Sequence, residues 1–174
     1  MSRVCFDYGH GGRDSGATYK SRKESDDVLL LGQEVATYLR NHGVIVHETR
    51  TSNRSLGLWE RVRFENKNTY DYFISFHRNA FKPELANGAE TYVYLQSGVK
   101  AYNLAIDIQK ALEEIGFRNR GVKRGNFYVL RGTRAPALLL EIGFIDQTKD
   151  NELFDNKKEE IVRVLGEMIL AHLG

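Results

Sequence analysis

Short apolar stretches that alternate with segments of helical period limit the fold of this sequence more than any other feature. Six stretches have the length of a strand, and most are rich in β-branched or aromatic residues. They span residues 3–8, 44–49, 72–77, 90–95, 127–131 and 137–144. Such alternation is typical of an α/β domain. We therefore predict one domain over residues 1–174, with a twisted, mostly parallel sheet of about six strands and helices on both faces.

Four helices are expected between and after these strands. The first carries apolar residues at steps of three and four from Val28 to Leu39, and Gly43 follows it. The second covers residues 55–67, with Ser55 as its N-cap. The third runs from about Ala101 to Ile115, and the last covers about residues 157–173.

The composition limits the kinds of molecule that this protein is expected to bind. The 174 residues, 41% of them hydrophobic, suffice for one core, and the net charge of +2 gives no field that would draw nucleic acid or anionic lipid. We therefore expect that the protein binds neither nucleic acid nor membranes. We also expect it to be a monomer. Cys5, the single cysteine, lies between apolar residues and is expected to be a buried thiol. No apolar run approaches the ~18 residues of a membrane span, and no signal peptide is recognisable.

Chemically versatile residues lie at or near the ends of three predicted strands. His10 follows the first strand, His77 ends the third and Glu141 lies within the last. Ligands of open α/β sheets bind beyond the carboxyl ends of the strands, where loops converge. A catalytic zinc site needs three imidazole or carboxylate ligands and an open position for water. Two imidazoles and a carboxylate at these ends therefore favour a zinc hydrolase.

The third zinc ligand is expected to be Glu24, just before the first helix. Asp26 and Asp27 are adequately explained as acids of the first helical turn, and Asp14 as a turn residue. Glu141, which follows three leucines, is then a carboxylate in apolar surroundings. Beside a metal it could serve as general acid and base.

Each of these residues also has a simpler interpretation. A histidine at a strand end is often only a hydrogen-bonded structural residue, and a buried glutamate is often an ion-pair partner. The stretch GHGGRDSG could suggest a nucleotide loop, but Asp14 stands where the G-x-G-x-x-G pattern has its third glycine.

Several longer motifs together resemble a known family. DYGHGGRDSGA, RKESD, ETRTSNRSLGLWERV, FISFHRNA, GAETYVY and NRGVKRGNFYVLRGTRAPALLLEIGFID occur in this order. They are similar to the zinc-dependent N-acetylmuramoyl-L-alanine amidases of bacterial autolysins, sporulation lysins and phage endolysins. The resemblance implies one Zn²⁺ per chain, held by His10, Glu24 and His77, with Glu141 as the catalytic residue. It also implies hydrolysis of the peptidoglycan amide between N-acetylmuramic acid and L-alanine.

Two positions depart from the family pattern, and a few others invite hypotheses. Asn53 replaces a common aspartate and Arg78 occupies a variable position, so we expect altered loop pairing or substrate contacts there. Asp7 either orients a ligand histidine or has a plain turn or salt-bridge role. The basic stretch FRNRGVKR is either a solvated loop or a site for carboxylates of the muramyl peptide. We assign substrate contacts to Asn79 and Arg131.

Two other functions remain open from the sequence. The same domain could bind peptidoglycan without cleaving it, and FRNRGVKR could bind nucleic acid. We expect a protein that stays in the cytoplasm until it is released onto the cell wall. A phage lysin, a mother-cell lysin and a domain of a longer enzyme all fit, and we expect no separate cell-wall-binding domain in these residues.

Overall fold

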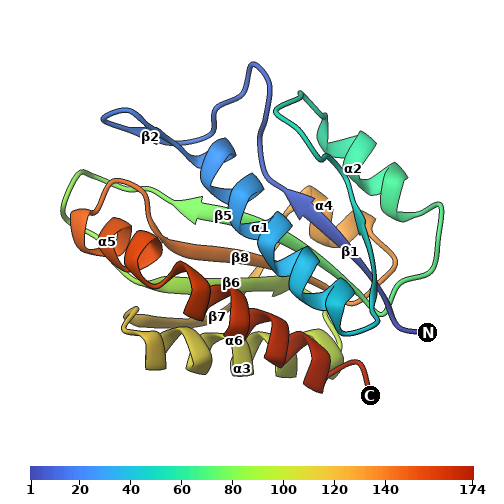
Figure 1. Cartoon of the computed structure of the whole chain (residues 1–174). Coiled ribbons are helices and arrows are strands. Elements are labelled where there is room, and N and C mark those ends of the chain that lie inside the picture. Colours follow the sequence, from blue (N-terminus) through green and yellow to red (C-terminus); the bar gives the residue numbers. More distant parts are fainter.

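A six-stranded sheet forms the centre of the computed structural model, which describes residues 1–174 (Figure 1). Its strands lie in the order β4-β1-β5-β8-β6-β7. All neighbours run parallel except β6 and β8, which are antiparallel. The predicted α/β class and mostly parallel sheet are confirmed. The strands are β1 (Arg3–Tyr8), β4 (Ile45–Glu48), β5 (Tyr72–Asn79), β6 (Ala89–Tyr94), β7 (Asn119–Gly125) and β8 (Ala137–Phe144).

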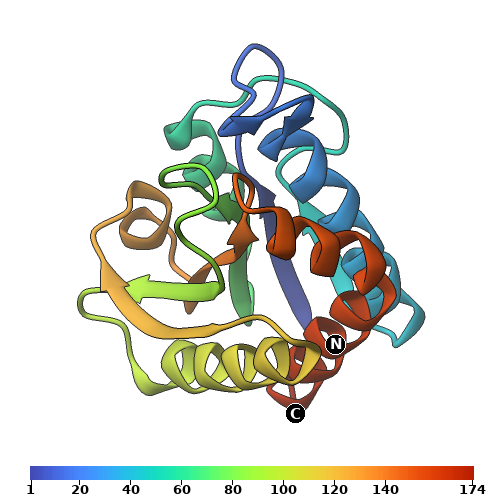
Figure 2. The same cartoon turned by 90° about the vertical axis from the view of Figure 1, so that its left-hand side faces the viewer.

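Helices cover both faces of the sheet, as predicted (Figures 1 and 2). One face carries α1 (Glu24–Asn41), α3 (Val99–Ile115), α5 (Thr148–Asn156) and α6 (Lys158–Ala171). The other face carries the shorter α2 (Leu58–Glu65) and α4 (Tyr128–Gly132). A small hairpin of β2 (Thr18–Tyr19) and β3 (Arg22–Lys23) precedes α1.

Two apolar clusters fill the space on either side of the sheet. Alternate residues of a strand point to opposite faces, so Phe6 of β1 joins a cluster of 28 buried residues under α1, α3 and α6. Its neighbour Cys5 is buried in a cluster of 8 residues with Val62 of α2 and Val129 of α4, as expected for a strand thiol. The same alternation sends Asp7 toward the face of α2 and α4, where it contacts Ser75.

The region from residue 119 to 132 differs from the sequence prediction. The predicted strand at 127–131 is wrong, because these residues form the N-cap and most of α4. The sixth strand is instead β7, within the basic stretch, so the loop interpretation of that stretch is also wrong. A five-residue apolar run cannot distinguish a buried helical turn from a strand, and charged side chains are common on edge strands.

Two details of the helices also differ from the sequence prediction. Ser55 is not the N-cap of α2: Gly57 is, and its backbone N–H donates to Glu60 Oε2 at 2.7 Å. The short, polar helix α5 was not predicted. The other predicted helices agree with α1, α3 and α6 within a few residues.

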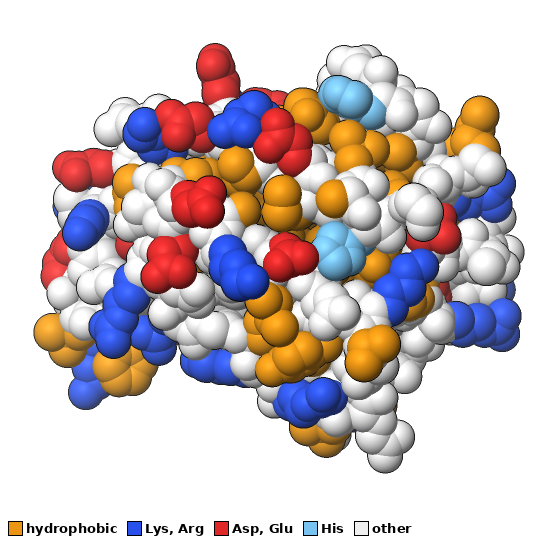
Figure 3. Space-filling model, turned by 90° about the horizontal axis from the view of Figure 1, so that it is seen from below, with side chains coloured by type: hydrophobic (Ala, Val, Ile, Leu, Met, Phe, Trp, Pro, Cys, Tyr) orange, Lys and Arg blue, Asp and Glu red, His pale blue; other side chains and the backbone are white.

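Charges of both signs mix on the surface near α3, as the near-neutral net charge suggests (Figure 3). Acidic and basic side chains alternate there with apolar ones, without a patch of one sign. No helix has both the length and the apolar character needed to cross a bilayer.

The close packing of α1 against β1 gives a test of the fold. A Cβ added at Gly32 would lie 2.0 Å from the Tyr8 ring. Replacing a helical glycine by alanine normally gains about 1 kcal/mol, whereas overpacking a core costs about 1–3 kcal/mol. We therefore expect Gly32→Ala to lower the free energy of unfolding by about 1 kcal/mol or more in urea denaturation.

A second variant isolates the contact with Tyr8. Gly32→Ala should cost less in a Tyr8→Leu background than in the wild type, because the ring it meets is then absent. Equal costs in the two backgrounds would show that the ring does not limit this position.

Candidate active site

His10 lies in a tight turn directly after β1. Its backbone has a φ angle of 61°, which lies in the left-handed region that residues other than glycine rarely adopt. Gly11 and Gly12 continue the turn, also with positive φ angles. Gly9 also has a steric role, because a Cβ there would lie 2.3 Å from the ring of His77. The glycines thus let the chain turn sharply and allow the two histidines to approach.

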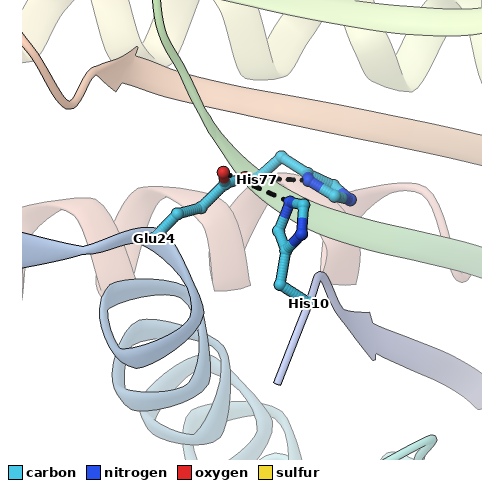
Figure 4. Close-up of side chains that lie close together, drawn as sticks. All are labelled: His10, Glu24 and His77. Atoms are coloured by element: carbon cyan, nitrogen blue, oxygen red, sulfur yellow. Dashed lines mark hydrogen bonds and ion pairs between the residues drawn. The ribbon is translucent and has the colours of Figure 1, made fainter. Parts of the chain in front are cut away.

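Glu24 is the first residue of α1 and is only 4% exposed. One carboxylate oxygen, Oε2, lies 3.2 Å from His10 Nε2, and the other, Oε1, lies 2.9 Å from His77 Nδ1 (Figure 4). The backbone N–H groups of Ala17 and Arg78 donate to the same two oxygens, each at 3.0 Å. The carboxylate is therefore fixed from several directions.

The three side chains form a cluster that suits a divalent metal. One ligand atom from each of His10, Glu24 and His77 lies within 4.8 Å of the others, and the three residues come from the β1 loop, the start of α1 and β5 (Figure 4). Two imidazoles and one carboxylate are the donor set of many catalytic zinc sites. The residues present therefore fit the ion that the sequence predicts.

Electrostatics within the cluster are strongly coupled. Burial opposes the charged form of His10, but the Glu24 and Asp14 carboxylates raise its pKa to about 9. Burial also opposes the charged form of Glu24, yet its contacts with His10 and His77 lower its pKa. A cation in the cluster would take the place of the imidazole protons that face Glu24.

Asp14 holds the other side of the His10 ring. Its Oδ2 lies 2.8 Å from His10 Nδ1, while its Oδ1 accepts the N–H of Gly16 at 2.9 Å. Asp14 therefore has the predicted role in the turn and also contacts the His10 ring. A carboxylate on Nδ1 leaves Nε2 free to bind a metal and fixes the orientation of the ring.

Asp7 takes part in a buried ion pair beneath the His10 loop. Its Oδ1 accepts from Arg61 Nη1 at 2.8 Å and from the Thr49 hydroxyl, and its Oδ2 accepts from the Ser75 hydroxyl. Arg61 also donates to the carbonyl of His10 at 2.8 Å. Of the roles weighed for Asp7, the structure shows the salt bridge, and its link to His10 runs through Arg61.

The two departures from the family pattern have structural roles. Asn53 Oδ1 accepts the N–H of Gly12 at 2.8 Å, so it pairs two loops, as expected. Arg78 turns away from the cluster and forms an ion pair with Asp27 at 2.6 Å. Asp26 is exposed, and neither aspartate joins the group of His10, Glu24 and His77 that could hold a metal.

Glu141 lies beside this cluster on β8. It is the register partner of His77 on β5, and its Oε2 is shielded from solvent without a hydrogen-bond partner. Burial raises the pKa of Glu141 to about 7, an effect that the nearby His77 partly offsets. A carboxylate with a pKa near neutrality can both accept and return a proton.

A cavity of about 470 Å³ opens onto His10, His77 and Glu141. Its opposite wall is apolar and comes from the N-terminal parts of α2 and α4, with Leu56, Leu58, Phe127 and Tyr128. The cavity has the size of a small-molecule site and brings polar groups to one end.

The two predicted substrate contacts, Asn79 and Arg131, do not line this cavity. Asn79 donates to Glu90 Oε1 at 2.8 Å. Arg131 is exposed on α4 and lines a separate cavity of about 290 Å³ with Lys100 and Arg134. Their assignment as substrate contacts stays a prediction.

The sequence interpretation did not single out Arg50 and Arg61, although both are buried beneath the site. Arg50 donates to the carbonyls of Tyr8, Gly9 and Ser25 and so joins β1 to the start of α1. The pattern of the helix offered one indication for Arg61. This residue lies next to Val62, and both belong to the buried face of α2. A charged residue at such a position needs a buried partner.

Comparison with known proteins points to one family. Residues 4–170 match the N-acetylmuramoyl-L-alanine amidase family. The chain is 37% identical to the N-acetylmuramoyl-L-alanine amidase CwlM of Bacillus licheniformis, over 87% of this chain and 60% of that protein. It is 34% identical to the endolysin of Bacillus phage SPP1, over 94% of this chain and 62% of the endolysin. The chain thus spans about three fifths of the length of these relatives.

Solved structures agree in fold. An N-acetylmuramoyl-L-alanine amidase from Clostridium difficile 630 superposes with a TM-score of 0.93 at 28% identity, over 99% of this chain and 96% of that one. The catalytic domain of the amidase CwlV from Bacillus (Paenibacillus) polymyxa var. colistinus superposes with a TM-score of 0.90 at 29% identity, over 99% of this chain and 98% of that one. On the match over residues 4–170 and these similarities, the chain belongs to the N-acetylmuramoyl-L-alanine amidase family.

Proposed function

We propose that this chain hydrolyses the amide bond between the lactyl group of N-acetylmuramic acid and the L-alanine of the peptidoglycan stem peptide. The family and the names of the relatives support this bond and this substrate. One observation carries the proposal further: the metal-binding group of His10, Glu24 and His77 lies beside a shielded carboxylate oxygen of Glu141.

We further propose that His10, Glu24 and His77 hold one Zn²⁺. When bound, the ion would polarise the scissile carbonyl and lower the pKa of water. Asp14 fixes the His10 ring from behind, and the Asp7–Arg61 pair supports the loop that carries it.

Glu141 provides the proton transfer in this proposal. The Glu141 carboxylate, which lines the cavity, would accept a proton from the attacking water and return it to the departing amine of alanine. No hydrogen bond holds its Oε2 in another contact. Apolar residues of α2 and α4 line the wall across the cavity and would exclude bulk water from the bound amide.

Metal content tests the ligand assignment. The purified wild type should contain one zinc per chain by elemental analysis, and His10→Ala and Glu24→Gln should each lose most of it while remaining folded by circular dichroism. Asp26→Asn is the matched control, since Asp26 is an exposed acid of the same helix. Full zinc in Glu24→Gln would contradict the assignment of this ligand.

Removal of the Glu141 carboxylate tests catalysis apart from metal binding. Glu141→Gln keeps the size of the side chain but cannot accept the proton, so kcat on soluble muropeptides should fall by about 10²–10⁴-fold. Zinc content should stay at one per chain, and Glu114→Gln, at an exposed glutamate, should leave kcat unchanged. A Glu141→Gln variant with wild-type turnover would overturn the mechanism. A zinc-loaded wild type that binds but never cleaves would favour the non-catalytic module.

A substitution of Asp14 tests whether its contact with the His10 ring supports zinc binding. Asp14→Asn can still accept the Gly16 N–H, but it replaces the carboxylate oxygen facing His10 Nδ1. We expect the affinity for zinc to fall by about 10–100-fold in a competition titration with a chelating dye. Unchanged affinity in Asp14→Asn would show that this contact serves only the turn.

A further inference from the structure

Glu90 is a buried carboxylate that the proposed mechanism does not use. It is 3% exposed and accepts hydrogen bonds from four side chains. Asn79 Nδ2 and the Tyr92 hydroxyl donate to Oε1 at 2.8 and 2.9 Å. Arg120 Nε donates to Oε2 at 2.8 Å, and Lys123 Nζ donates to the same oxygen. Three of the sequence motifs, FISFHRNA, GAETYVY and NRGVKRGNFYVL, therefore meet at one carboxylate.

This cluster lies next to the catalytic centre. Glu90 on β6 is the register partner of Glu141 on β8, and Lys123 on the next strand pairs with Tyr92. Because neighbouring strands are about 4.8 Å apart, β7 lies roughly 10 Å from the strand of Glu141. The ring of Phe127, which lines the catalytic cavity, packs on Tyr92 with 5.0 Å between centroids. The cluster thus adjoins the wall of the cavity through the contact between these two rings.

The cluster carries more positive than negative charge. Arg120 and Lys123 share a single carboxylate, and their side chains are 27% and 38% exposed. Each has N–H groups beyond the one that Glu90 accepts. Glu90 therefore holds two cations in place while leaving a net positive charge and free donors at the surface.

The other side chains of the basic stretch do not share this position. Arg124 follows Lys123 and points to the opposite face, where its guanidinium lies 5.3 Å from the centre of the Tyr102 ring of α3. It donates to the carbonyl of Leu95 at 2.9 Å. The structure thus separates Arg120 and Lys123 from Arg124.

We propose that Arg120 and Lys123 form a subsite that binds the carboxylate of the second residue of the stem peptide, with Glu90 as the positioning residue. The proposal rests on the proposed function, which places the scissile amide beside Glu141. An extended chain advances about 3.3–3.6 Å per residue, so the backbone of the second residue ends roughly 7 Å beyond that amide, and its acidic side chain can extend the carboxylate to roughly 10 Å. That distance matches the separation of β7 from β8, and the two cations match the charge.

Two soluble substrates test the subsite. Both are N-acetylmuramoyl peptides of the same sequence, and the second residue carries a free carboxylate in one and a carboxamide in the other. The zinc-loaded wild type should show a kcat/KM about tenfold higher for the carboxylate form. Equal values would overturn the subsite and leave the proposed function standing. Cleavage of neither substrate would contradict both proposals.

Variants of the cluster locate the effect. In Lys123→Gln the preference should fall to about twofold or less through a higher KM for the carboxylate form, and Lys123→Arg should restore most of it. Arg124→Gln removes the same charge from the same strand on the other face and should keep the wild-type preference. A preference lost equally in both glutamine variants would indicate a general charge effect and contradict the subsite.

Glu90→Gln separates positioning from a structural role. It should raise KM for the carboxylate substrate and change kcat/KM for the carboxamide little, because only the first uses the two cations. An equal loss on both substrates, with unchanged zinc content, would show that Glu90 merely supports the sheet and would overturn its assigned role.

Discussion

The carboxylate of Glu24 is the contact on which the site depends. It lies between His10 and His77, and backbone N–H groups of Ala17 and Arg78 donate to the same oxygens. One side chain thereby fixes the loop after β1, the start of α1 and the end of β5 relative to one another. Without a metal, the Glu24 carboxylate raises the pKa of both histidines against the opposing effect of their burial. The same arrangement provides a set of donors for a divalent cation.

The surrounding structure keeps this cluster in place through buried charges. Arg61 pairs with Asp7 and donates to the carbonyl of His10, and Arg50 donates to the carbonyls of Tyr8 and Gly9. Breaking a buried ion pair costs about 3–5 kcal/mol, because the remaining charge has no partner. A loop that holds His10 at a positive φ is thus supported by interactions much stronger than those of an exposed turn.

The sequence predicts the sheet and the proximity of His10, Glu24 and His77 well, for physical reasons. Strands β1, β5 and β8 are buried on both faces, so they read as continuous apolar runs. Parallel strands bring His10 and His77 to one edge of the sheet, and the register then places Glu141 beside His77. The prediction failed at β7 and α4, where an edge strand is rich in charge and a helix is five residues long. It also missed Arg50 and Arg61, whose importance depends on contacts between distant segments.

The central claim is that His10, Glu24 and His77 together hold one zinc ion. Anomalous diffraction from a crystal of the zinc-loaded protein, measured on both sides of the zinc edge, tests it most directly. The account predicts one peak per chain, about 2.0–2.1 Å from a nitrogen of each histidine and about 2.0–2.2 Å from a Glu24 oxygen. A peak at other residues, or no peak among these three side chains in zinc-loaded crystals, would contradict it.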